Sequence, residues 1–410
     1  MKNLSKSKYT TYCQCPKALW LRIYKPEEQI IDPSVQARFE AGSEVGELAK
    51  RLFGEFEDVT TYVPMDDGSQ CLDLKAMIAK TQDCLNRNVE HIAEAAFSYD
   101  GCYCAVDILH KTENGYAIYE VKSSTDLSHL EVYAQDVAYQ KYVLTNCGIN
   151  VTGTYLVNIN NEYVLDGELN VKEFFNINDI SEAVTNEYLK VPTRIAQAKQ
   201  MLEGDEPERD FGEYCHKPYG CTFWEYCSRD IIPHPSVFDL YRMSFKKALE
   251  HMNEGRLTLE NMREEKLTDT QQLQLECTLG DKTYINKDGI KEFLTQLSYP
   301  LYFLDFETEQ TVIPKYQGTH PYQQVTFQYS LHYIEQEGGE LKHTEFLGDG
   351  VTDPRRALAE QLCHDIPMNV CTTAYNKAFE CTRLKELAEA YPDLAPHLIN
   401  IKEHIVDLLD

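Results

Sequence analysis

Alternating hydrophobic and polar positions are clearest in residues 102–122, where two strand-like runs flank Asn114 and Gly115. β-branched and aromatic residues favour strands, and Asn-Gly is typical of the tight turn of a β-hairpin. The pattern therefore predicts a hairpin here. Residues 91–98 predict the strand before it, and residues 72–90 predict a helix.

Side chains of the second hairpin strand alternate between faces, so Glu120 and Lys122 are expected on one face, ~6.6 Å apart. Asp107 on the partner strand can approach Glu120, which places two carboxylates and an ammonium group at one strand end. Hard oxygen ligands suit Mg²⁺ or Mn²⁺, and the Val121 carbonyl could add another oxygen. The alternative is an ordinary hairpin with Glu-x-Lys on its solvent face.

The order Asp107, Glu120, Lys122 and then a helix with Gln140 and Tyr142 resembles the nuclease core of the PD-(D/E)XK superfamily, RecB-like branch. The resemblance implies a restriction-endonuclease-like mixed sheet flanked by helices. It also implies that Asp107 and Glu120 hold the metal ion and that Lys122 assists the attacking water. Gln140 and Tyr142 would then help to fix the metal site and the nucleic acid.

Two carboxylates elsewhere in this region are weaker candidates. Helical periodicity over residues 34–54 places Glu47 after Gly46, where related nucleases carry a metal-binding side chain. Glu47 is therefore a weak metal candidate, with a solvent-facing helix charge as the alternative. Glu94 is expected either to support the metal ligands or to be a charge at a strand edge.

The chain has 14 cysteines, most of them single and expected to be small buried side chains. The exceptions are Cys13, Cys15, Cys215, Cys221 and Cys227. One thiolate near the start and three later ones provide four soft ligands, as an iron–sulfur cluster needs. The five-residue gaps between the later three differ from the paired knuckles of zinc sites. Reduced thiols without metal are the alternative.

This arrangement resembles the cluster of the AddB and CRISPR-associated four-cysteine nucleases, in which one cysteine precedes the nuclease core and three follow it. The resemblance implies a 4Fe-4S cluster that joins both ends of the domain. Its ligands would be Cys15, Cys215, Cys221 and Cys227. Cys15 is followed by Pro16 and matches the first ligand of the family better than Cys13 does.

Residues 231–296 differ in character, with a proline-bearing start and amphipathic helical runs. They are interpreted as a helical linker between a first domain, residues 1–230, and a last domain, residues 297–410. A helix-hairpin that touches a DNA backbone is the alternative.

In the last third, residues 299–306 form a mostly apolar strand that leads into Asp305 and Glu307. Two carboxylates two residues apart on a strand face the same way, which again suits a divalent metal ion. Two further alternating runs around a Gly-Gly pair predict a second hairpin.

The order of Asp305, Glu307, Asn376 and Phe379 resembles the DnaQ-like exonucleases of the ribonuclease-H fold. The resemblance implies an α/β domain in which Asp305, Glu307 and Glu380 bind metal ions, Glu380 standing where the family usually has aspartate. The last motif of the family, a histidine or tyrosine followed by aspartate, is missing after Asp407. The domain is therefore expected to be incomplete and its catalysis doubtful.

Composition places limits on this interpretation. With 410 residues, 43% of them hydrophobic and 26% charged, the chain is long enough for two or three globular domains. The net charge of −27 argues against long-range attraction to DNA. There is no run of 18 apolar residues and no apolar core after the basic start, so no membrane partner and a cytoplasmic location are expected.

The function expected from these patterns is metal-dependent hydrolysis of DNA, exonucleolytic on single-stranded ends, in DNA repair, recombination or defence. The pairing of a cluster-bearing RecB-type nuclease with a DnaQ-like domain is similar to a bacterial and archaeal family of that architecture. One alternative is a non-catalytic iron–sulfur scaffold or nucleic-acid-binding subunit. Another is DnaQ-like exonuclease activity in a longer protein. Protein partners are not predicted.

Overall fold

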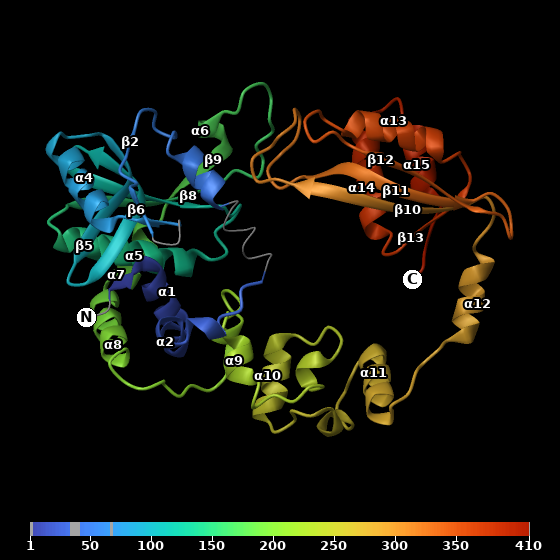
Figure 1. Ribbon diagram of the computed structural model, residues 1–410, viewed down its shortest axis with the longest axis horizontal. Helices are drawn as coiled ribbons and strands as arrows, with labels where there is room; N and C mark the ends of the chain where they lie inside the picture. Colours follow the sequence, from blue (N-terminus) through green and yellow to red (C-terminus); the bar gives the residue numbers. More distant parts are fainter. Residues whose placement is uncertain (1–2, 33–41, 66–68, 410) are drawn as a thin grey trace. The chain divides into compact units, whose positions relative to one another are not determined.

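A computed structural model describes residues 3–32, 42–65 and 69–409 of the chain. These residues form two compact units, one of Met1–Tyr163 with Glu168–Lys282 and one of Val164–Gly167 with Thr283–Asp410. The expected class is confirmed, because mixed sheets are flanked by helices and a helical region lies in the middle of the chain (Figure 1). No helix in the described ranges is long and apolar enough to cross a membrane.

The first unit is built on a mixed sheet in the order β2-β5-β6-β7-β8-β9, with β1 beside β6. Its strands are β1 Leu4–Ser5, β2 Glu57–Asp58, β5 His91–Tyr99, β6 Cys102–Thr112, β7 Gly115–Lys122, β8 Val151–Ile159 and β9 Phe175–Asp179. A separate pair is formed by β3 Tyr62–Pro64 and β4 Gln70–Leu72.

The first unit also contains several helices. They are α1 Lys6–Gln14, α2 Pro16–Tyr24, α4 Leu74–Asn86, α5 Leu130–Asn146, α6 Val171–Phe174, α7 Ser181–Tyr188, α8 Val191–Met201 and α9 Trp224–Ser228, with short 3-10 turns η1 Pro26–Glu28 and η2 Glu213–Cys215. Residues 42–49 are also helical. The earlier part of the helix predicted over residues 34–54 lies outside the described residues.

The predicted hairpin is confirmed as β6 and β7, but its turn is one residue earlier than expected. Gly115 already pairs with Thr112, so Glu113 and Asn114 make the turn. Gly115 has φ +156°, and a Cβ atom at this position would come within 2.2 Å of the Asn150 carbonyl oxygen. Glycine is therefore required by close contact of two backbones.

The connection from β7 to β8 runs through α5, so these two strands are parallel while β5, β6 and β7 pair antiparallel. Helix α5 packs on the sheet, and the side chains between them form the core of the first unit. Tyr139 of α5 stacks on Tyr9 of α1, with 4.8 Å between the ring centroids. Its hydroxyl donates to the Leu4 carbonyl and accepts from the Tyr103 amide. One phenol therefore fixes the N-terminal segment to the sheet.

The helical region between the two sheets has a small core of its own. Its elements are η3 Val237–Asp239, α10 Phe245–Asn253, η4 Leu259–Met262, α11 Asp269–Gly280 and α12 Lys287–Thr295. Buried Val237, Ala248, Met262 and Leu275, one from each of the first four of these elements, belong to this core. The helices through α11 belong to the first compact unit, whereas α12 belongs to the second. The predicted linker, residues 231–296, is thus divided between the units.

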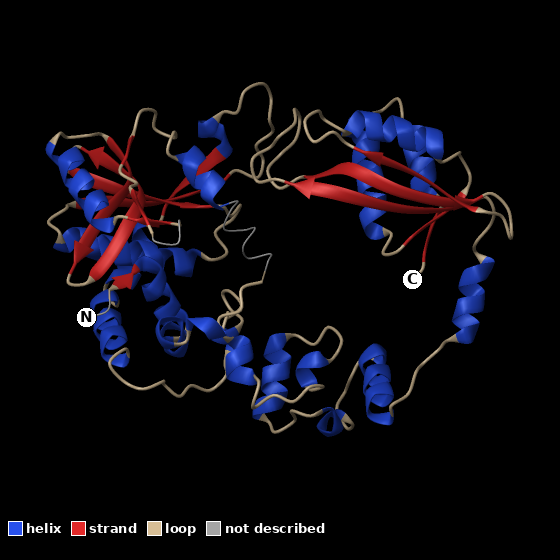
Figure 2. Ribbon diagram, in the orientation of Figure 1, coloured by secondary structure: helices blue, strands red, loops and turns tan. Residues whose placement is uncertain are grey.

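The second unit contains a five-stranded sheet in the order β12-β11-β10-β13-β14. Its elements are β10 Leu301–Gln310, β11 Gln324–Ile334, β12 Leu341–Leu347, α13 Arg355–Asp365, β13 Cys371–Ala374, α14 Ala378–Ala390, α15 Ala395–Glu403 and β14 Ile405–Asp407. The first three strands are antiparallel, and β13 runs parallel to β10 and β14. The helices pack around the sheet, as Figure 2 shows. Leu304 and Phe306 of β10 are buried in this core, whereas Asp305 and Glu307 are exposed.

Gly115→Ala is expected to lower the free energy of unfolding by about 1–3 kcal/mol, because the new methyl group meets backbone and the φ angle is unfavourable. Gly46→Ala is the matched control, since Gly46 is helical and has open space around it. Alanine there is expected to leave stability unchanged or raise it by up to about 1 kcal/mol. Urea unfolding measures both variants, and equal stability of Gly115→Ala and wild type would contradict the close contact.

Candidate active site

Carboxylates meet where the β6–β7 pairing ends. The ladder runs to the pair Ile108 and Tyr119. Beyond it, the Val121 amide donates to Asp107 Oδ2 at 2.7 Å. Glu120 lies between, and its side chain is only 1% exposed. The hairpin thus brings two carboxylates together. The Val121 amide donates to the Asp107 side chain instead of to a backbone carbonyl of β6.

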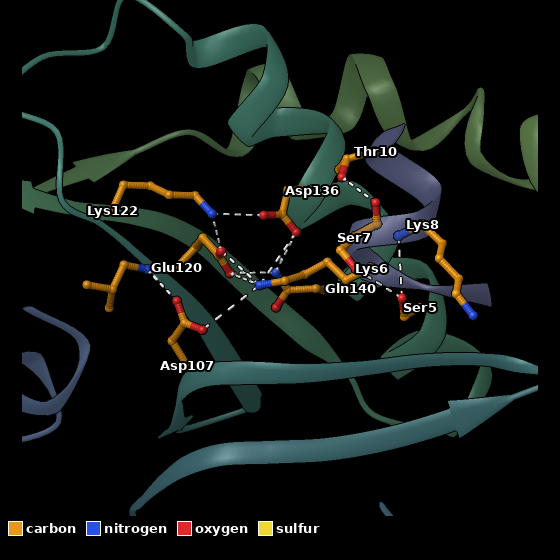
Figure 3. Close-up of polar contacts among 11 residues, drawn as sticks. Ser5, Lys6, Ser7, Lys8, Thr10, Asp107, Glu120, Lys122, Asp136 and Gln140 are labelled. Atoms are coloured by element: carbon orange, nitrogen blue, oxygen red, sulfur yellow. Dashed lines mark hydrogen bonds and ion pairs between the residues drawn. The ribbon is translucent and has the colours of Figure 1, made fainter. Parts of the chain in front are cut away.

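The Glu120 carboxylate receives four close contacts (Figure 3). Lys6 Nζ lies 2.9 Å from Oε1 and 3.1 Å from Oε2. Lys122 Nζ contacts Oε1 at 2.5 Å, and Gln140 Nε2 donates to Oε2 at 2.6 Å. A carboxylate offers about four lone-pair positions, so these contacts satisfy Glu120 fully.

Asp136 supplies a third carboxylate. It precedes Gln140 by one helical turn, so both side chains leave the same face of α5. Lys122 Nζ lies 2.9 Å from Asp136 Oδ2, and Lys6 Nζ lies 3.6 Å from Oδ1. Lys6 Nζ is also 3.9 Å from Asp107 Oδ1. Three carboxylates and two ammonium groups leave this group, which we call the carboxylate–lysine site, with a formal charge of −1.

Burial and neighbouring charges shift the pKa values of the acids in this site in different directions. Burial, and next the charge of Glu120, raise the pKa of Asp107 to about 6. Burial would also raise the pKa of Glu120, but Lys122 and Lys6 outweigh burial and hold that pKa well below its usual range. Burial lowers the pKa of Lys6, yet the surrounding carboxylates, Asp136 first, raise it well above normal. Both lysines therefore remain charged.

Glu94 on β5 belongs to the surroundings of Asp107. Burial, and next the charge of Asp107, raise the pKa of Glu94 to about 7. Its backbone has φ +56°, the left-handed region that non-glycine residues seldom adopt. Such strain is often found at functional sites. The charge of Asp107 thus reaches Glu94, as a supporting role would require, and that role stays a prediction.

The structure does not bring two of the predicted residues to the site. Glu47 is 72% exposed and pairs with Lys50 at 2.5 Å. Tyr142 lies among aromatic rings, 6.3 Å from Tyr99 and 6.5 Å from Tyr188 between centroids. Asp107, Glu120, Lys122 and Gln140 do come together.

Two residues of the site were missed by sequence reasoning. Asp136 had a detectable signal, because it stands four residues before Gln140 on a predicted helix. Lys6 had none, since 114 positions separate it from Glu120 and no periodic pattern connects them.

Four predicted cysteines line one cavity of the first unit. They are Cys15, Cys215, Cys221 and Cys227. Cys15 lies between α1 and α2, Cys215 ends η2, and Cys227 is in α9. The Cys221 amide donates to the Cys215 carbonyl at 2.9 Å. Burial, with smaller effects of the three other thiols, raises the pKa of Cys221 to about 11.

Cys13 lies apart from this thiol cavity. Burial raises the pKa of its thiol, and its charged neighbour is Arg194, not another cysteine. Of the two candidates for a first thiol ligand, only Cys15 shares the cavity with the later three. Gln14, next to Cys15, connects the cavity wall to the following segment, because its Nε2 donates at 2.8 Å to the carbonyls of Tyr214, which lines the cavity, and of Tyr219. The Tyr219 ring lies 5.2 Å from that of His129, at the start of α5.

Acids also gather in the second unit. Glu380 in the first turn of α14 is 4% exposed, and its Oε2 has no hydrogen-bond partner. Burial raises its pKa first, and the charges of Asp305 and Asp407 raise it further. Asp407 accepts the Asn376 amide at 2.9 Å. Glu307 lies two residues along β10 on the exposed face that carries Asp305.

Within residues 3–32, 42–65 and 69–409, no group of three or more His, Cys, Asp or Glu side chains is arranged to hold a metal ion as it stands. In the carboxylate–lysine site this has a visible cause, because two ammonium groups stand among the carboxylates (Figure 3).

Comparison with protein families finds a similarity in the second unit. Residues 302–410, within the second unit, match the family described as Domain of unknown function (DUF2779). No curated protein matches the chain.

The raised pKa of Glu94 predicts a pH-dependent stability. The folded protein holds this proton more tightly than the unfolded chain, so deprotonation costs stability as the pH rises from about 4.5 to about 7. In EDTA, Glu94→Gln is expected to increase the free energy of unfolding by about 1–2 kcal/mol at pH 8, since partial exposure screens the charge. At pH 4.5 the increase should largely disappear.

Urea unfolding at both pH values measures this difference. Glu90→Gln is the control, because Glu90 is 74% exposed on the segment before β5. Its effect should be small at both pH values. An equal effect of Glu94→Gln at pH 4.5 and pH 8 would contradict the assignment.

Proposed function

We propose that the chain is a metal-dependent nuclease that hydrolyses phosphodiester bonds of DNA, acting on single-stranded ends. The observation that supports this best is the convergence of Asp107, Glu120, Asp136 and Lys122 at one end of the β6–β7 hairpin. The strands β5, β6, β7 and β8 are neighbours in this order in the sheet, and α5 connects β7 to β8. This arrangement agrees with a RecB-like PD-(D/E)XK core.

The residues present fit Mg²⁺ or Mn²⁺. Asp107 and Glu120 would hold the ion, because carboxylate oxygens are its preferred ligands. Gln140 Oε1 is buried beside Glu120 without a hydrogen-bond partner, so the site contains a polar atom that a metal-bound water would satisfy. When bound, the metal ion would activate a water molecule and offset charge on the phosphodiester.

The side chains of the chain itself prepare the site. Lys122 is held between Glu120 and Asp136, which keep its ammonium group charged and fixed in direction. In that position it would orient the attacking water or stabilise the developing anion. Gln140 fixes the plane of the Glu120 carboxylate through one oxygen.

The four thiols that line one cavity support a 4Fe-4S cluster as its ligand, although as they stand they are not arranged to hold a metal ion. All four cysteines are free thiols, and the charge of Cys15 contributes to the raised pKa of each of the later three. Metal binding would replace the thiol protons, whose loss burial opposes. The cluster would join the end of α1 to the segment of residues 215–227 and so close a loop of about 200 residues.

A second candidate activity belongs to the second unit. The unpartnered Glu380 carboxylate oxygen, near Asp305 and Asp407, favours a further divalent cation site. Such a site would agree with the DnaQ-like resemblance of this region. It is the competing explanation for any cleavage by the chain.

Degradation of labelled single-stranded DNA with Mg²⁺ or Mn²⁺ tests the first activity. Lys122→Ala is expected to lower the rate by about 10²-fold or more, because the fixed ammonium group is lost. Lys111→Ala is the control on the same hairpin, since Lys111 contacts Asn88 outside the site. It should keep the wild-type rate.

Asp305→Asn in the same assay separates the two units. Loss of cleavage in Asp305→Asn with full cleavage in Lys122→Ala would assign the activity to the second unit. No cleavage with either metal ion would favour a non-catalytic scaffold.

The thiol assignment predicts a coloured protein. After anaerobic purification, absorption near ~400 nm with bound iron and sulfide is expected, as iron–sulfur thiolate sites show. Cys15→Ser should lose most of the iron, whereas Cys13→Ser, two residues away and outside the cavity, should retain it. A colourless wild-type protein with one zinc ion would contradict the cluster.

A further inference from the structure

Lys6 stands at the centre of the carboxylate–lysine site. Among the described cationic residues, it alone forms ion pairs with Asp107, Glu120 and Asp136. Figure 3 shows its ammonium group between the three carboxylates, at the end of a side chain that enters from the first turn of α1. This is where a divalent cation would find the most oxygen ligands.

The contacts of Glu120 prevent a metal ion and the Lys6 ammonium group from occupying the same position together. Lys6 contacts both of its oxygens, Lys122 contacts one and Gln140 the other, which uses all of the lone-pair positions. A metal ion needs at least one of these positions. Gln140 is wholly buried in α5, and Lys122 Nζ lies closer to Asp136 than Lys6 Nζ does, at 2.9 Å against 3.6 Å. The donor that covers both oxygens is Lys6.

We propose that the Lys6 ammonium group is an internal counter-cation that occupies the divalent metal position and is displaced when the metal ion binds. The inference rests on the proposed metal-dependent function, and it adds a residue that sets the metal affinity. On metal binding, the single positive charge of Lys6 is replaced by the two charges of the metal ion. The carboxylates therefore have a cation beside them both with and without metal.

Displacement requires only the side chain to move. The backbone beside Lys6 is held by the Leu4 amide, which donates to the Gly101 carbonyl at 2.9 Å, and by the Tyr139 hydroxyl on the Leu4 carbonyl. The Ser5 side chain caps α1 by accepting the Lys8 amide at 3.4 Å. The Lys6 side chain itself is 25% exposed, so part of it already lies at the surface.

Titration of the full chain with Mn²⁺, followed by calorimetry or by the EPR signal of free Mn²⁺, tests the proposal. Lys6→Met keeps an unbranched side chain, one atom shorter, and removes its charge. It is expected to tighten Mn²⁺ binding by about tenfold or more, because a cation no longer competes at this distance. Lys8→Met, two residues along the same helix, should bind Mn²⁺ as wild type does. Unchanged or weaker binding in Lys6→Met overturns the proposal.

A thermal measurement keeps the test decisive if Lys6→Met folds poorly. Without metal, the variant leaves buried carboxylates with one cation fewer and should melt at lower temperature than wild type. Added Mn²⁺ should therefore raise the melting temperature of Lys6→Met more than that of wild type. Lys6→Arg retains the charge and should show no such extra rise. An equal rise in all three proteins overturns the proposal.

The test of Lys6 and the test of the proposed nuclease function can fail independently. Cleavage of DNA by wild type at saturating Mn²⁺ tests the nuclease, and the ratio of the two Mn²⁺ affinities tests Lys6. Cleavage with a ratio of one refutes the role of Lys6 and leaves the nuclease. No cleavage with a large ratio refutes the nuclease and supports Lys6 as the counter-cation.

Discussion

The buried carboxylate of Glu120 is the constraint on which the first unit depends. A charge that is removed from water must be paired and hydrogen-bonded, or the folded state loses several kcal/mol. Three different elements meet this requirement, since α1 provides Lys6, β7 provides Lys122 and α5 provides Gln140. The Glu120 charge is therefore contacted by α1, by β7 of the hairpin and by α5. The same compensation makes the site strongly polar inside an otherwise apolar core.

Features that follow from local patterns could be predicted from the sequence. The hairpin, the shared face of Glu120 and Lys122, and the exposed face of Asp305 and Glu307 all follow from the two-residue period of strands. Fold class followed from the alternation of strand and helix patterns. The grouping of four cysteines also agreed with their spacing, although the resemblance to a known cluster guided that choice.

Features that depend on packing between distant segments were not predicted. Lys6 reaches Glu120 only because β1 pairs with β6, and no local pattern reveals such a pairing. The left-handed backbone of Glu94 likewise depends on its neighbours in the sheet. Tyr142 is a different case. It follows Gln140 by two residues, about 200° around a helix, so helical geometry itself places the two side chains on opposite faces.

The position of α1 has a consequence for the order in which the protein folds. This helix precedes the rest of the first unit in the sequence, yet Lys6 meets a partner 114 positions away and Gln14 one 205 positions away. The Lys6 contact needs the chain up to Glu120 and the Gln14 contact needs it up to Tyr219, so each closes a long loop. Helix α1 is therefore fixed at these two points only after the distant segments have joined it. Until then, the carboxylates around Glu120 remain open to water and ions.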